Sequence, residues 1–191
     1  MNALPLQIIG AGTVAAVLLA LLLGRAPAIR RGILALDRLL TGLATILASL
    51  ALALAVAAGL WQVIARFLTE TPAIWSEALV RTALIWMALL GLAAAIRAGA
   101  LVSIDIAHRY SHGTLRRALE AATLAGILSL MGVLFWFGWL MAERVKFQEM
   151  AGLEVSMSWG YAAIPLGALF CMVGALAHFL DRRSEELEAA V

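Results

Sequence analysis

The sequence predicts an all-α integral membrane protein, a bundle of five transmembrane helices with its N-terminus outside the cell and its C-terminus in the cytoplasm. Composition is the first reason: 64% of the 191 residues are hydrophobic and 14% are charged. A soluble domain is about 45–50% apolar and about 25% charged. The other reasons are five long apolar stretches and an uneven distribution of arginines between the segments that join them.

The five apolar stretches are each long enough to cross a bilayer, because ~20 helical residues at ~1.5 Å each span its ~30 Å core. They are Leu4–Leu23, Leu39–Ala65, Ala78–Ile96, Ala121–Ala142 and Val155–Leu180. The first has no basic residue before it and is longer than the apolar core of a signal peptide, so we expect it to be retained. Pro165 predicts a kink in the last stretch.

The segments between the spans set the orientation. Segment 24–38 mixes arginines with apolar residues, which predicts an amphipathic connector lying at the cytoplasmic interface, and 181–191 is a short charged tail. Together with loop 97–117 they carry most of the basic residues, so the positive-inside rule places all three in the cytoplasm. Five tryptophans lie near the span ends that face away from the cytoplasm and are candidate interface anchors. Trp86, Arg97 and Asp105 are further candidates. These anchors are Trp61, Trp75, Trp86, Arg97, Asp105, Trp136, Trp139 and Trp159.

The chemistry that a working membrane site needs is missing from the sequence. None of the twelve acidic residues lies in the middle of a predicted span, where an ion-coupled transporter usually holds one. His108 and His112 are four residues apart, which supplies two metal ligands at most. The lone Cys171 excludes a disulfide framework. We therefore expect a non-enzymatic subunit without a catalytic, metal or substrate site and without a cofactor.

The third span carries Arg81 and Arg97 near its two ends, with only about fifteen residues between them, too few to cross a bilayer comfortably. Glu77 precedes Arg81 by one helical turn, so the two side chains can pair. They share a helix face with small residues, whereas Arg97 lies about 160° away. We expect Arg81 to mark a helix contact at the outer side and Arg97 to be a lipid-facing anchor. The alternative is that both arginines extend to the headgroups.

Small residues spaced by four let membrane helices approach closely. Several of them, with three charged residues, are candidates for helix packing or a subunit interface. The set is Arg66, Glu77, Arg81, Gly91, Ala95, Gly99 and Gly167.

A series of short motifs in the central region resembles the small membrane subunit, or Q-type protein, of tripartite ATP-independent periplasmic (TRAP) transporters. The resemblance covers roughly residues 36–180. The motifs are Gln62–Phe67, Trp75–Glu77, Arg81, Trp86, Leu90–Gly91, Arg97–Gly99, Ile104–Asp105 and Pro165–Gly167. The resemblance implies a four-helix scaffold in the bacterial inner membrane, bound to a large multi-span transport subunit. A periplasmic substrate-binding protein would deliver an organic acid, and a sodium gradient would drive uptake through sites in the large subunit.

Two features depart from that family pattern. Ala100–Ser103 lacks the histidine that the family often has there, and residues 1–23 form a helix extra to the four-helix core at 39–180. The extra helix would put the N-terminus in the periplasm. The alternative function is an independent small transporter or channel, and a membrane enzyme or haem protein ranks third.

Overall fold

The computed structural model describes residues 4–23, 27–68, 73–99 and 114–188, and their regular structure is helical apart from one isolated bridge between Glu149 and Ser156. The helices are α1 (Leu4–Leu23), α2 (Pro27–Leu68), α3 (Ile74–Arg97), α5 (Thr114–Arg144), α6 (Ser158–Tyr161) and α7 (Ala163–Glu188). Four of them, α2, α3, α5 and α6–α7 taken together, contain stretches long and apolar enough to cross a membrane.

These four candidate spans coincide with four of the five stretches predicted to cross the membrane. The fifth, α1, has 20 residues, but its described side chains form only a shorter apolar helix over Gln7–Leu18. A membrane crossing by α1 therefore stays a prediction, and so does the orientation of the chain.

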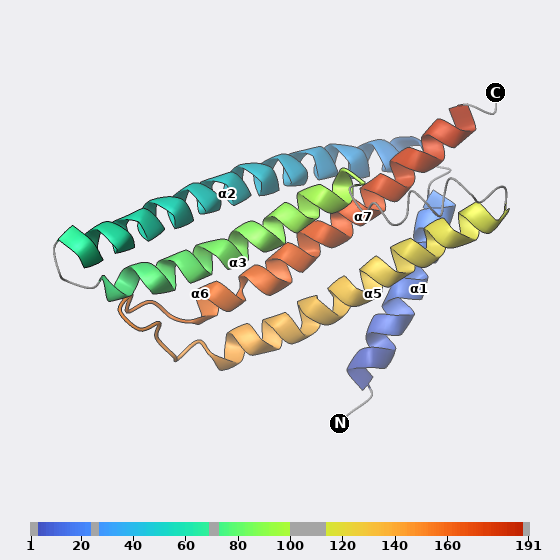
Figure 1. Ribbon diagram of the computed structural model, residues 1–191. Helices are drawn as coiled ribbons and strands as arrows, with labels where there is room; N and C mark the ends of the chain where they lie inside the picture. Colours follow the sequence, from blue (N-terminus) through green and yellow to red (C-terminus); the bar gives the residue numbers. More distant parts are fainter. Residues whose placement is uncertain (1–3, 24–26, 69–72, 100–113, 189–191) are drawn as a thin grey trace.

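The long helices lie side by side, with α3 between α2 and α7, and α7 between α3 and α5, while α1 packs against α5 (Figure 1). This order makes α7 the central helix. In its span 56% of the most apolar window is buried, against 22% in each of the other three. The main core cluster joins α3, α5 and α7 through residues such as Ala93, Leu128 and Cys171.

Helix α2 differs from the sequence prediction at its start. Its 42 residues form one continuous helix of ~63 Å, about twice the ~30 Å hydrocarbon core. Residues 27–38 are its first turns, so the predicted connector at 24–38 is not a separate element. Residues 24–26 lie outside the described part of the chain.

The last span is interrupted near its start. The helix breaks at Ala162, between α6 and α7, and Pro165 lies in the first turn of α7. Proline has no N–H to donate to the carbonyl of Tyr161, four residues earlier, so the hydrogen-bond ladder is interrupted at this point. The last span is therefore irregular near Pro165, as predicted, and the irregularity lies close to the start of α7.

A stripe of alanines on α2 explains how closely it packs on α3. Its buried apolar residues recur at steps of four, seven, three and seven, which fit the three-and-four spacing of a helix–helix seam. They are Ala44, Ala48, Ala55, Ala58 and Ala65. Leu90 of α3 packs against Ala44 and Ala48, so a large side chain on one helix meets small ones on the other. The opposite face of α2 exposes leucines, Leu39 and Leu50 among them at about 60%.

Helix α3 packs with the face that the sequence analysis assigned to lipid. Its buried residues are Ser76, Ala83, Leu90, Ala93 and Ile96. The small-residue face of α3 is more open, since Ala88 is exposed and a Cβ at Gly91 would meet nothing within 4 Å. Because α2 supplies the small residues at the seam, α3 can contribute leucine there.

Candidate functional site: a buried charge network joining three helices

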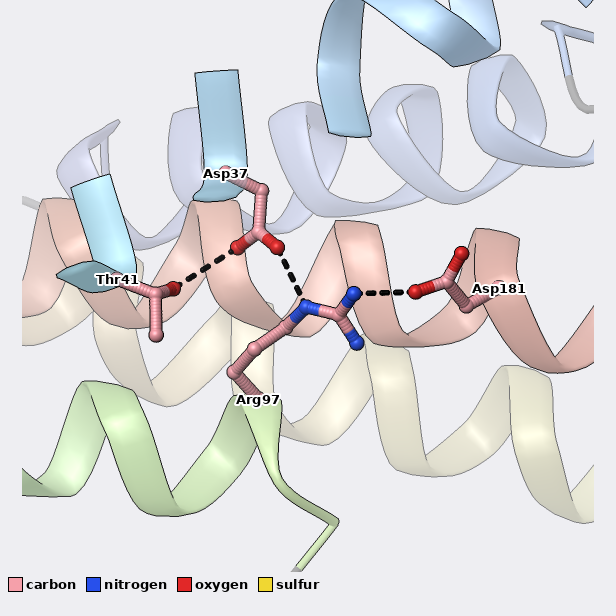
Figure 2. Close-up of polar contacts among 4 residues, drawn as sticks. All are labelled: Asp37, Thr41, Arg97 and Asp181. Carbon is pink, nitrogen blue, oxygen red and sulfur yellow. Dashed lines mark hydrogen bonds and ion pairs between the residues drawn. The ribbon is translucent and has the colours of Figure 1, made fainter. Parts of the chain in front are cut away.

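Three helices bring charged side chains together at one end of the bundle. Asp37 lies in the early part of α2, Arg97 is the last residue of α3, and Asp181 lies in the later part of α7 (Figure 2). The N-terminal end of α2 and the C-terminal ends of α3 and α7 lie at the same end of the molecule (Figure 1). Residues far apart in the sequence therefore meet in one cluster.

Arg97 is the centre of this network. Its Nε donates to Oδ2 of Asp37 at 2.5 Å, and its Nη2 donates to Oδ2 of Asp181. The hydroxyl of Thr41 donates to the other carboxylate oxygen of Asp37 at 3.1 Å. The planar guanidinium presents its donors in a fixed fork, which lets one side chain bind carboxylates from two different helices.

The network is largely withdrawn from solvent. The side chain of Asp37 is 1% exposed, that of Arg97 is 23% exposed and that of Asp181 is 34% exposed. A buried charge is tolerated only when it is paired and hydrogen-bonded. Asp37 meets this condition through Arg97 and Thr41, and Asp181 is the member of the network closest to water.

The structure contradicts the expectation that Arg97 faces lipid. Arg97 follows Leu90 by seven residues, two helical turns, so it continues the buried face that runs through Ala83 and Leu90. Its side chain consequently points between α2 and α7. Arg97 lies on the side of the helix where the sequence predicted it, but that side was expected to face lipid because the small residues of α3 were expected to mark the packed face.

The depth of the network follows from helix geometry. Asp37 lies ~36 Å along α2 from Trp61, and Arg97 lies ~33 Å along α3 from Trp75. Both distances match or slightly exceed the ~30 Å hydrocarbon core. With the tryptophans at one membrane interface, the network lies at the opposite one, where charged groups cost less than at mid-membrane. It joins the three helices at the end of the bundle away from those tryptophans.

The expected ion pair between Glu77 and Arg81 is also present, with Arg81 Nη2 at 2.8 Å from Glu77 Oε1. Its two side chains are 65% and 74% exposed, so this pair lies on the surface near the start of α3. An exposed pair four residues apart on a helix contributes little to stability, about 0.3–0.5 kcal/mol. The two arginines of the third span are therefore placed differently from the expectation: Arg97, at 23% exposed, is the more buried of the two.

The predicted small-residue contacts are found in part. A Cβ at Gly167 would lie 2.6 Å from Cβ of Leu89, so α7 approaches α3 closely there. Gly99 has φ +68°, and a Cβ on it would lie 2.9 Å from Cε1 of His178. Gly91 meets nothing within 4 Å, and Ala95 is half-buried. Gly167 and Gly99 thus have a steric role inside this chain.

The remaining predicted residues lie mostly on the surface. Trp86 is half-buried and donates its Nε1 to the carbonyl of Trp159, which ties α3 to α6. The exposed ones are Trp61, Arg66, Trp75, Trp136, Trp139 and Trp159. Asp105 lies outside the described residues. The tryptophans lie late in α2 and α5, early in α3 and within α6, parts that gather at one end of the bundle (Figure 1).

Sequence reasoning missed two of the three charged members of the network. Asp181 was assigned to the charged tail at 181–191, and Asp37 to the amphipathic connector at 24–38. One signal could have found Asp37: it continues the three-and-four spacing of the alanine stripe through Thr41 to Ala44. A buried stripe that includes an acid calls for a basic partner on the facing helix.

Comparison with protein families identifies the chain. Residues 55–185 match the model described as the DctQ component of tripartite ATP-independent periplasmic transporters. The chain belongs to the DctQ family. This confirms the resemblance noted in the sequence, and it makes the chain a multi-span component of a transporter of the bacterial inner membrane, a non-enzymatic protein. The match covers the last third of α2, all of α3, α5 and α6 and most of α7, while α1 and the earlier part of α2, with Asp37, precede it.

A DctQ-type relative is the sialic acid TRAP transporter small permease protein SiaQ of Vibrio cholerae serotype O1, which is 31% identical over 110 residues. The similar region covers 58% of this chain and 64% of the relative. The chain therefore spans less than two thirds of the relative's length.

Proposed function

We propose that this chain is the small scaffold subunit of a secondary transporter that imports an organic acid across the inner membrane. It would support a large multi-span transport subunit, which receives the acid from a periplasmic binding protein and couples uptake to a sodium gradient. The substrate and sodium sites would lie in the large subunit, and this chain would hold no cofactor of its own. The relative's name includes sialic acid, which fits the proposed substrate class.

The observation that carries this proposal is the place of the charges. No Asp, Glu, Lys or Arg occurs in the stretches 39–65, 82–96, 121–142 and 155–180, so the interior of the four spans offers no charged group to bind an ion or an acid. The charge that is buried, on Asp37 and Arg97, joins helices at one end of the bundle. Such an arrangement fixes the relative positions of α2, α3 and α7, which is what a supporting subunit needs.

The exposed apolar face of α2 suits the proposed contact with the large subunit. Leucines and small residues alternate there, with Gly42 and Gly59 open to the surroundings. A lipid-facing helix would share the leucines, but close approach of a partner helix also uses the glycines. Glu77 and Arg81 remain candidates for a further contact at the tryptophan-rich end.

Orientation and the role of α1 are part of the proposal. The described parts of the arginine-rich segments, at the start of α2 and the ends of α3 and α7, lie at the opposite end of the bundle from the tryptophan-rich parts. This supports a cytoplasmic C-terminus and a periplasmic N-terminus. In that arrangement α1 is a fifth span beside α5. Ile9 of α1 packs so close to Gly132 of α5 that a Cβ on the glycine would lie 3.1 Å from Cγ2 of the isoleucine.

Co-purification tests the proposal. This chain, tagged at its C-terminus and co-expressed with the large membrane subunit of its transporter, should recover that subunit from detergent in a fixed ratio. The alternative is an independent small transporter or channel, and it predicts that the chain purified alone moves solute in liposomes. Recovery of the tagged chain without the large subunit, together with solute movement by the chain alone, would decide for the alternative.

A further inference from the structure

A cavity of about 450 Å³ opens at the tryptophan-rich end of the bundle, far from the charge network. One wall is a single face of α3, which includes Glu77, Arg81 and Ile85, and the other comes from the connector before α6 and from α6 and α7. The volume lies in the range of small-molecule sites, about 300–1,000 Å³. Of its lining, the proposed scaffold role uses at most Glu77 and Arg81, and the apolar remainder has no part in that role.

The lining of the cavity has an apolar part and a charged part. Its body is apolar, with Ile74, Ile85, Met157 and Ile164 among the lining residues, whereas the Glu77–Arg81 ion pair supplies full charges of both signs. A ligand that fits this lining carries an apolar chain and a polar group with charges of both signs.

The ion pair leaves binding capacity unused. Arg81 donates to Glu77 from Nη2, and Glu77 accepts on Oε1. A guanidinium has five N–H donors and a carboxylate has two acceptor oxygens, so both groups can bind a ligand while the pair stays intact. A free anion would meet Glu77 beside Arg81 and would be repelled by it, whereas a zwitterion can place each of its charges on the opposite one.

The flanking tryptophans give the depth of the cavity. Trp75 and Trp159 are 41% and 65% exposed, and exposed tryptophans of membrane proteins gather at the headgroup level. Arg81 follows Trp75 by ~9 Å along α3, within reach of the headgroups for a long side chain. The polar part of the cavity therefore lies where phospholipid headgroups are, and its apolar part lies beside the acyl chains.

We propose that this cavity binds a phospholipid whose headgroup carries a phosphate and a primary ammonium, as phosphatidylethanolamine does. The phosphate accepts hydrogen bonds from Arg81, the ammonium donates to Glu77, and part of one acyl chain packs against Ile85 and Ile164. Choline lipids retain the phosphate but have no N–H to donate to Glu77. Glycerol headgroups retain the phosphate and lack the positive charge. The site is thus selective for the ammonium lipid.

Native mass spectrometry of the full chain, delipidated in detergent, tests this proposal. Phosphatidylethanolamine, phosphatidylcholine and phosphatidylglycerol are titrated separately, and the fraction of protein with one bound lipid is measured. The ethanolamine lipid should bind most tightly. Arg81→Gln should weaken its binding at least about tenfold, the equivalent of losing one charge-assisted hydrogen bond. Arg66→Gln is the matched control, because Arg66 is also exposed in the tryptophan-rich part of the chain, and it should change binding little.

A second variant tests the cavity without altering its charges. Ala78 is half-buried and lines the cavity, so Ala78→Phe should fill the apolar part and lower lipid binding while Glu77 and Arg81 remain. Circular dichroism and gel filtration establish that each variant is folded. Equal binding of the three lipids, or binding unaffected by both Arg81→Gln and Ala78→Phe, would overturn the proposal. Loss of the large subunit from Ala78→Phe with unchanged lipid binding would also overturn it, since the cavity would then receive a protein side chain.

Discussion

The charge network makes a sharp prediction about the two arginines of α3. Arg97→Gln removes the positive charge that binds both Asp37 and Asp181. Asp181 is 34% exposed and can be rehydrated, but Asp37 is 1% exposed and cannot. Removing one partner of a buried ion pair costs about 3–5 kcal/mol. Because Asp37 is the fully buried carboxylate of the two, we expect a loss near the lower value, about 3 kcal/mol.

The matched variant is Arg81→Gln, on the same helix. Its pair with Glu77 is exposed, so its loss should cost below about 1 kcal/mol. For a chain of this length about 1 kcal/mol corresponds to about 2–4 °C in the unfolding midpoint. Arg97→Gln should therefore lower the midpoint by roughly 6–12 °C, and Arg81→Gln by less than about 4 °C. Tryptophan fluorescence during heating in detergent measures both.

A double variant shows whether the buried charge is the cause. Asp37→Asn, added to Arg97→Gln, removes the buried carboxylate that has lost its arginine. The double variant should therefore recover more than half of the fall in unfolding midpoint that Arg97→Gln causes. Equal midpoints for Arg97→Gln and Arg81→Gln, or a further fall in the double variant, would refute the account of the network.

Three further predictions concern packing and backbone, each measured by the same thermal assay. Gly167→Ala should destabilise the chain by about 1–3 kcal/mol because its Cβ would lie 2.6 Å from Leu89, whereas Gly91→Ala, with nothing within 4 Å, should be neutral. Gly152→Ala should cost about 1–3 kcal/mol, since Gly152 has φ +82° and its Cβ would lie 2.9 Å from the backbone nitrogen of Trp75; an unchanged midpoint would contradict this packing. Replacing the whole network with neutral residues (Asp37→Asn, Arg97→Met and Asp181→Asn together) should be less harmful than Arg97→Gln alone, and a lower midpoint than the single variant would count against the burial argument.

Hydrophobicity alone located the four candidate spans, because the length of an apolar stretch is tied directly to the thickness of the bilayer. It did not locate the ends of α2. Segment 27–38 contains arginines and leucines in a pattern typical of an interfacial helix, and only its continuity with the alanine stripe shows that it extends the span. Local composition cannot report that continuity, because it depends on the packing partner.

The pairing of charges was harder to predict for the same reason. Glu77 and Arg81 are neighbours on one helix, so their spacing was enough to predict their ion pair. Asp37, Arg97 and Asp181 come from three helices, and their meeting depends on which helix lies beside which. Small residues on α3 suggested the wrong packed face, because the seam with α2 takes its small residues from α2 and its leucine from α3.

Uptake by reconstituted liposomes tests the central claim most directly, namely that this chain supports transport without containing the transport path. Liposomes are prepared with the large subunit and this chain, with either alone, and with the charge-network variant Arg97→Gln in the complex. Sodium-driven uptake of the acid delivered by the binding protein should require both subunits, and it should be absent with this chain alone. Uptake by the large subunit at the same rate without this chain, or uptake by this chain alone, would contradict the account.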